Sequence, residues 1–271
     1  RVWLGVHWLF DGFTAAPSGG IDLTRNIGGV PLGIKVAEDI YANGLKPSPV
    51  GPRAAKGTCH MPPVSKHTQA KTLRISVENL APAGGTILAP LWFGFHDGSF
   101  EGFRLGAPAS AALQRLAEDG NTGPLANSFL AAERGLIQGT VFGSDDIFNS
   151  LLPGHTSQTL VQVVPDARAR YFSYAAMVVP SNDAFVANVQ PTVHEVFSTG
   201  GGFLGADIIV LGSGVLDAGT EVNDEAAFHA IGAGPVFIAD AGVPENGVVH
   251  VHPGYQPGGA MLLARITSPQ R

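Results

Sequence analysis

Short runs of β-branched and aromatic residues, separated by turns, recur along residues 71–271 and constrain the fold most strongly. Residues 72–80 (TLRISVENL) alternate Leu73, Ile75 and Val77 with polar residues, the period-two pattern of a strand with one buried face. The 36 glycines and 20 prolines supply frequent turn signals. Further strand candidates lie at 86–95, 159–164, 171–179, 206–211, 247–251 and 260–267. Roughly seven short strands of this kind predict an all-β fold, an antiparallel β-sandwich.

Two segments between the predicted strands have helical character. In residues 110–120 (SAALQRLAEDG), Ser110 can cap a helix, Leu113 and Leu116 share one face, and Gly120 can end it. Residues 125–134 predict a second short helix that stops at Gly135. The sandwich is therefore expected to carry short helical insertions.

The first 70 residues differ from the rest of the chain in their residue pattern. They contain scattered glycines and prolines and stretches with almost no hydrophobic periodicity, such as LKPSPVGPRAAKGTCHMPPVSKHTQAK. We expect an extended or irregular N-terminal arm over residues 1–70 and a sandwich domain over residues 71–271.

Composition excludes several classes of function. The net charge of -6 and the lack of a basic cluster argue against a nucleic-acid surface. The apolar runs are all shorter than the roughly 18 residues that a membrane helix needs. The single cysteine, Cys59, rules out a disulfide within one chain, so the fold must depend on its core or on a metal.

Two predicted strands end in turns that carry carboxylates. Residues 171–179 run into Asp183 of a Pro-Ser-Asn-Asp turn, and residues 206–211 are followed by Asp217 and Glu221 of an Asp-Ala-Gly-Thr-Glu turn. Three carboxylates with backbone carbonyls at one end of a sandwich suit calcium, which binds six to eight oxygens. The alternative is that Asp and Asn are simply common turn residues.

The histidines form a second candidate set. His250 and His252 alternate along a predicted strand and therefore point to the same face, while His96 and His194 lie at strand or loop ends. Convergence of His96, His250 and His252 would create a copper or zinc site. Alternatively, each histidine is a separately placed polar residue bonded to backbone or water.

Local motifs give no support for catalysis. Gly212 and Gly214 imitate a dinucleotide fingerprint, but Asp217 occupies the position of its third glycine. His194-Glu195 begins a zinc-protease pattern whose second histidine is replaced by Ser198. The chain also lacks a Gly-x-Ser-x-Gly nucleophile elbow. We therefore predict no catalytic residues and a non-enzymatic role.

Several longer motifs occur in an order that resembles a known family. They are ENLAP (78–82), LWFGFHDGSF (91–100), LAEDGNTGPL (116–125), YFSYAAMVVPSNDAF (171–185), LGADIIVLGSGVLDAGTEVNDE (204–225) and HPGY (252–255). Together they resemble the bacterial branch of the spondin N-terminal domain family, from about Leu73 to the C-terminus. The resemblance implies a β-sandwich similar to calcium-dependent lipid-binding domains, in a secreted, periplasmic or cell-surface adhesion protein. An extracellular protein, glycan or lipid would be its partner.

The resemblance also implies a set of calcium ligands. In animal members, calcium is held by the aspartate of a Ser-Pro-Asp turn and the two acids of an Asp-Ala-Gly-Thr-Asp turn. By motif these correspond to Asp183, Asp217 and Glu221, with Asn182 in place of the proline and Glu221 in place of an aspartate. Two hypotheses follow. The first is a calcium-binding adhesion module, and the alternative is a surface copper-binding protein for metal acquisition or redox chemistry that uses His96, His250 and His252.

Overall fold

The computed structural model describes residues 14–15, 21–22, 69–143, 149–224, 242–255 and 260–268. The chain divides into two units, Arg1–Met61 and Pro62–Arg271. In the first unit, β1 (Thr14–Ala15) pairs antiparallel with β2 (Ile21–Asp22). Most of the predicted N-terminal arm, residues 1–70, lies outside the described residues.

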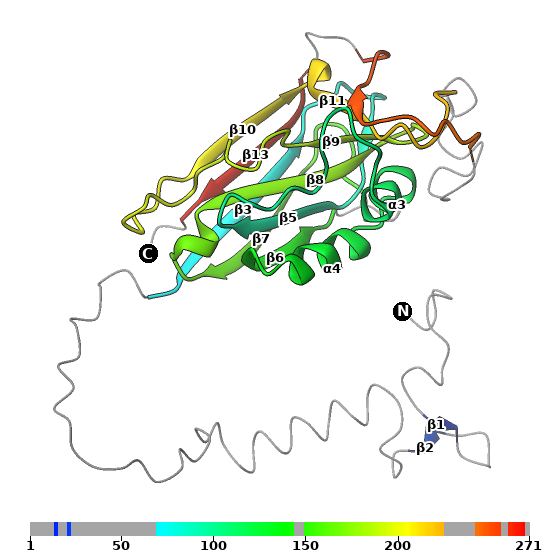
Figure 1. Ribbon diagram of the computed structural model, residues 1–271. Helices are drawn as coiled ribbons and strands as arrows, with labels where there is room; N and C mark the ends of the chain where they lie inside the picture. The colour runs from blue at the N-terminus through cyan, green and yellow to red at the C-terminus, as the bar shows by residue number, and fades with distance from the viewer. Residues whose placement is uncertain are drawn as a thin grey trace, which may run out of the picture. The chain divides into compact units, whose positions relative to one another are not determined.

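The second unit is an all-β sandwich with helical insertions, as predicted (Figure 1). Every strand pairing described in it is antiparallel. One sheet has the order β10 (Ala206–Leu211), β13 (Ala260–Thr267), β3 (Lys71–Asn79) and β7 (Thr156–Val163). The other has the order β12 (His250–Val251), β11 (Val215–Asp217), β9 (Ala184–Ala187), β8 (Tyr171–Val179), β5 (Leu91–His96) and β6 (Gly135–Val141), with β4 (Ile87–Leu88) against the end of β8.

The main core lies between the two sheets. From β3 it receives Leu73, Ile75 and Val77, the residues whose alternation predicted this strand. From β8 it receives Phe172 and Tyr174, with two further inward residues beyond them. Burial of alternate side chains from facing sheets provides the hydrophobic driving force of a sandwich.

Two helices cover the outer face of the larger sheet, over β5, β8 and β9 (Figure 1). They are α3 (Ala111–Asp119) and α4 (Gly123–Ala132). Leu116 and Phe129 from these helices pack on Trp92 and Phe185 from the strands. Because β8 is covered on both faces, eight of its nine residues are buried, in contrast to the alternating pattern of β3.

The predicted caps of the first helix are confirmed. The Ser110 hydroxyl accepts a hydrogen bond from the Leu113 amide at 3.2 Å, and Gly120 ends the helix at a φ of 68°. The strand predicted over 86–95, with an interruption at Pro90, consists of two strands, β4 and β5: the Ala89 amide still donates to the Met177 carbonyl, and Pro90, which has no amide hydrogen, separates them. In the described part of the chain, none of the helices is long and apolar enough to span a membrane.

Candidate functional site

The register between β9 and β11 brings the two acidic turns together. Asp217 pairs with Ala184, and the Ala218 amide donates to the Asp183 carbonyl at 3.2 Å. Asp183 and Asp217 are fully buried, and Glu221 is 5% exposed. The structure therefore gathers at one end of the larger sheet the three carboxylates that the sequence singled out.

One oxygen of Asp183 organises the neighbouring turn. Its Oδ2 accepts hydrogen bonds from the Thr220 amide at 2.7 Å, the Thr220 hydroxyl at 2.9 Å and the Glu221 amide at 3.1 Å. Its Oδ1 is buried and has no hydrogen-bond partner among the described residues. Burial, followed by the nearby Asp217 charge, raises the pKa of Asp183 to about 6. An ionised Asp183 would therefore be stabilised by a cation at Oδ1.

Asp217 lies in a network that leads to His252. Its Oδ1 accepts from the Gly219 amide at 2.7 Å, and its Oδ2 accepts from Asn223 Nδ2 at 2.5 Å. Asn223 Oδ1 lies 3.1 Å from His252 Nε2, and the Gly254 amide donates to His252 Nδ1. This second bond makes Nδ1 an acceptor in the neutral ring, so Nε2 carries the hydrogen and donates to Asn223.

Glu221 lies against the backbone of a neighbouring loop. Its Oε1 accepts from the Gly242 amide at 2.7 Å. A Cβ atom at position 242 would approach Glu221 Oε2 to 2.4 Å, so a side chain there would displace the Glu221 carboxylate. The Glu221 carboxylate also lines a cleft of about 320 Å³ together with Glu118 and Thr220.

The carboxylates offer oxygen ligands, but they are not closed around a single point. Within the described ranges, no group of three or more His, Cys, Asp or Glu side chains is placed to hold a metal. The observation that fits calcium is limited to the buried Asp183 Oδ1, which has no hydrogen-bond partner among the described residues, and the nearby Asp217 carboxylate. A hard cation prefers such oxygen ligands.

The three-histidine copper site is not assembled, because His96 lies far from the other two. His96 pairs with Tyr171 at the start of β8, whereas His250 pairs with Asp217 in the row of Val178. Seven residues of strand correspond to about 23 Å. By contrast, His250 Nε2 and His252 Nε2 lie 3.7 and 4.0 Å from Asp217 Oδ2, so the predicted clamp pair adjoins the acidic turns.

His96 instead forms a buried polar pair with Ser173, a residue that the sequence did not single out. His96 Nε2 lies 2.8 Å from Ser173 Oγ, and the Gly98 amide donates to His96 Nδ1. The ring therefore donates from Nε2 and has no lone pair with which to accept the serine proton. Desolvation lowers the pKa of His96 to about 4. This geometry is a structural hydrogen bond, not a nucleophile with its general base.

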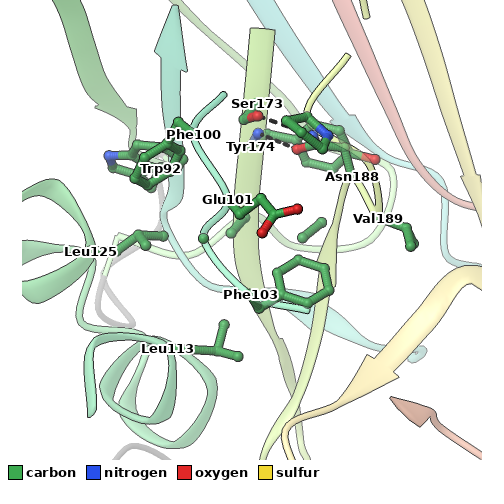
Figure 2. Close-up of a pocket in the computed structure, with 14 residues that line it drawn as sticks. Trp92, Phe100, Glu101, Phe103, Leu113, Leu125, Ser173, Tyr174, Asn188 and Val189 are labelled. Atoms are coloured by element: carbon green, nitrogen blue, oxygen red, sulfur yellow. Dashed lines mark hydrogen bonds between the residues drawn. The ribbon is translucent and has the colours of Figure 1, made fainter. Parts of the chain in front are cut away.

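Ser173 lies in a pocket between the larger sheet and the helices, shown in Figure 2. Asn188 Nδ2 donates to Ser173 Oγ at 3.0 Å, and Asn188 Oδ1 accepts from the Tyr174 amide. Trp92, Phe100 and other apolar side chains form the walls of this pocket. Its volume of about 20 Å³ holds about one water molecule, too little for an organic substrate.

Sequence reasoning missed the residues that connect these sites. Thr220 and Asn223 bind the two buried aspartates, and Asn188, which follows β9, donates to Ser173 of β8. The sequence offered one indication for Asn223, because it lies six residues after Asp217 in the same acidic segment. Ser173 and Asn188 gave no such signal, because cross-strand register brings them together.

Comparison with known proteins assigns no family to this chain. No protein-family model matches it. A curated relative, the vanadium chloroperoxidase of Curvularia inaequalis, is 32% identical over a match that covers 18% of this chain and 14% of that enzyme. The match spans about one seventh of the enzyme's length, and the spondin resemblance stays a prediction.

Proposed function

We propose that the sandwich is a calcium-stabilised, non-enzymatic binding module of a secreted or cell-surface adhesion protein. The observation that carries this proposal is the buried Asp183 Oδ1, which has no hydrogen-bond partner among the described residues and lies beside a second buried carboxylate. An unpaired buried carboxylate oxygen is unfavourable unless it is protonated or meets a cation. Calcium supplies that cation and prefers oxygen ligands.

Of the three proposed calcium ligands, Asp183 and Asp217 form a buried pair, and Glu221 lies at the edge of the site. Asp183 and Asp217 would hold the ion directly, because both are fully buried and Asp183 directly precedes β9, which pairs with the strand of Asp217. Glu221 would join them by turning away from the Gly242 amide, which it now contacts through Oε1. Calcium would thus join the 181–183 turn to the 217–221 turn and would stiffen this end of the sandwich.

Elemental analysis and thermal melts test this proposal. We expect about one equivalent of calcium in purified protein and a melting temperature that falls when a chelator removes it. Asp217→Ala should abolish the response to chelator and to added calcium. Asp207→Asn is the matched control, because Asp207 is exposed on β10, where it pairs with Arg265. An unchanged melt in wild-type protein with and without chelator would refute the proposal.

A second candidate, copper binding, is favoured by one observation at His250. Its Nδ1 lies 2.9 Å from the Val248 carbonyl and therefore donates to it, which leaves Nε2 with a lone pair near Asp217. Metal-binding histidines are commonly oriented by such a bond to a backbone carbonyl. A copper site here would use His250 and Asp217 without His96. Copper in place of calcium in the elemental analysis would favour this candidate.

A further inference from the structure

A polar cleft lies at the end of the sandwich opposite the acidic turns. It has a volume of about 430 Å³ and is formed by the loop after β5, the segment before β8 and the 198–201 turn. Arg170 immediately precedes β8 and Ser181 follows it, so the full length of this nine-residue strand separates the cleft from the acidic turns. That length is about 26 Å. The cleft is therefore separate from the proposed calcium site.

The lining of the cleft is rich in polar groups. Asp97, Asp166 and Arg170 contribute charged groups, and Ser198 and Thr199 contribute hydroxyls. Among the residues that line the cleft, the apolar side chains are those of Pro165 and Ala167, and both are small. Such a surface offers little to an acyl chain or an aromatic ring, so its ligand is polar.

The charges of the cleft restrict the ligand further. Arg170 Nε contacts Glu195 Oε1 at 2.9 Å, and its guanidinium lies 5.1 Å from the centre of the Tyr171 ring. The two carboxylates of the cleft also have cationic neighbours: Arg168 Nη2 lies 4.0 Å from Asp166 Oδ2, and the Arg134 charge helps to lower the pKa of Asp97. Because the charged groups of the cleft are balanced by opposite charges in this way, we expect it to favour a neutral ligand.

The polar groups are held in place by bonds of their own. Asp97 Oδ1 accepts from the Ser99 amide at 2.8 Å and the Ser99 hydroxyl at 2.6 Å, and Asp166 Oδ1 accepts from the Arg168 amide at 2.7 Å. Ser198 Oγ accepts from the Gly202 amide at 3.0 Å, which leaves its own hydrogen to donate. The cleft thus presents fixed acceptors and donors side by side, which lowers the entropic penalty of binding.

We propose that this cleft binds a neutral carbohydrate of one or two sugar rings. Each sugar hydroxyl both donates and accepts, so neighbouring hydroxyls match a wall of carboxylates, hydroxyls and a guanidinium. This inference rests on the proposed binding-module function for its biological meaning, and it names a ligand class for that module. It does not depend on the calcium site, since the two lie at opposite ends of β8.

Gly200 provides a direct way to fill the cleft without straining the fold. A Cβ at this position would have Ser198 Oγ as its nearest neighbour, at 4.0 Å, and the backbone is not left-handed there. Gly200→Trp should therefore fold normally and obstruct the cleft. Ala132→Trp is the matched control, because Ala132 is an exposed residue of α4.

The experiment is titration calorimetry and saturation-transfer NMR with a panel of neutral monosaccharides and disaccharides. We expect at least one sugar to bind with a Kd of about 1 mM, about tenfold weaker binding in Gly200→Trp and Asp97→Asn, and unchanged binding in Ala132→Trp. Binding should persist in chelator, well below the melting temperature, so a failed calcium proposal would not remove it. The inference is overturned if no neutral sugar binds, if only charged sugars bind, or if folded Gly200→Trp binds as wild type does.

Discussion

Asp183, in the turn just before β9, and Asp217, in the adjoining strand β11, are both fully buried, and one carboxyl oxygen of Asp183 has no hydrogen-bond partner among the described residues. Burial and then the Asp217 charge raise the pKa of Asp183 to about 6. The pair is therefore electrostatically unfavourable at neutral pH in the absence of a cation. This relationship underlies the calcium proposal and its most direct tests.

Asp183→Asn should make the metal-free protein more stable, although it removes a proposed calcium ligand. The amide oxygen can still accept from Thr220 and Glu221, and the uncharged amide removes the repulsion with Asp217. In chelator at pH 7 we expect the variant to be more stable than wild type by up to about 3 kcal/mol, measured by urea denaturation. Lower stability of the variant under these conditions would contradict the assignment of a strained Asp183 carboxylate.

The pH dependence of the unfolding free energy should reveal the titration of the Asp183 carboxyl group. The folded pKa of Asp183, about 6, exceeds its ordinary value of 3.8, so the folded state binds the proton more tightly. This group's contribution is therefore fully present below about pH 4 and is lost as the pH rises through 6. The difference in unfolding free energy between wild type and Asp183→Asn, in chelator, should change over that window. A difference that is flat between pH 4 and 7 would exclude the raised pKa.

His96 should contribute with the opposite sign. Desolvation lowers its folded pKa from 6.5 to about 4, so its contribution is present above pH 6.5 and is lost as the pH falls toward 4. His96→Gln can keep the donor to Ser173 but does not titrate. Across this window the unfolding free energy of wild type should fall relative to that of His96→Gln by about 3 kcal/mol. Parallel pH profiles for the two proteins would show that His96 titrates normally.

Gly135 should be intolerant of a side chain. A Cβ at this position would lie 2.1 Å from Phe129 Cζ and 2.4 Å from the Phe95 carbonyl oxygen, where α4 packs on β5 and β6. Gly135→Ala should therefore lower the unfolding free energy by about 1–3 kcal/mol through overpacking. Gly200→Ala, with its open surroundings, is the control and should change stability little. Equal effects of the two substitutions in thermal melts would argue against this packing.

Substitution of His250 should distinguish a calcium site from a copper site through its effect on the affinity for each metal. If calcium is the ligand, His250→Ala should leave its affinity nearly unchanged, because the imidazole contributes no oxygen. If copper is the ligand, the same change should remove a nitrogen ligand and lower copper affinity. Dialysis against each metal, followed by elemental analysis, measures both. Loss of calcium from folded His250→Ala would contradict the assignment of an oxygen site.

The sequence predicted most of the sandwich because its strands carry strong local signals. Leu73, Ile75 and Val77 alternate with polar residues, and Ser110 and Gly120 bound a regular helix. The short strands β9 and β11 were missed, since four and three residues give too little periodicity to read. Their pairing nevertheless joins Asp183 to Asp217.

At the candidate site, too, the sequence predicted local features but not the positions that strand pairing determines. Acidic turns at strand ends pointed to Asp183, Asp217 and Glu221, and the structure places these residues at the same end of the larger sheet, without a described group of three that could hold a metal. The spacing of the histidines could not show that His96 and His250 lie in rows seven residues apart along β8. Such positions depend on which strands pair and in what register, and that is set by packing across the whole sheet.

The central claim is tested most directly by equilibrium dialysis of the protein against radioactive calcium, with wild type, Asp183→Asn and the Asp207→Asn control. We predict about one bound calcium in wild type and in Asp207→Asn, and none in folded Asp183→Asn. Saturable binding that is equal in all three proteins, or no binding in wild type, would contradict the account of Asp183 and Asp217 as a calcium site.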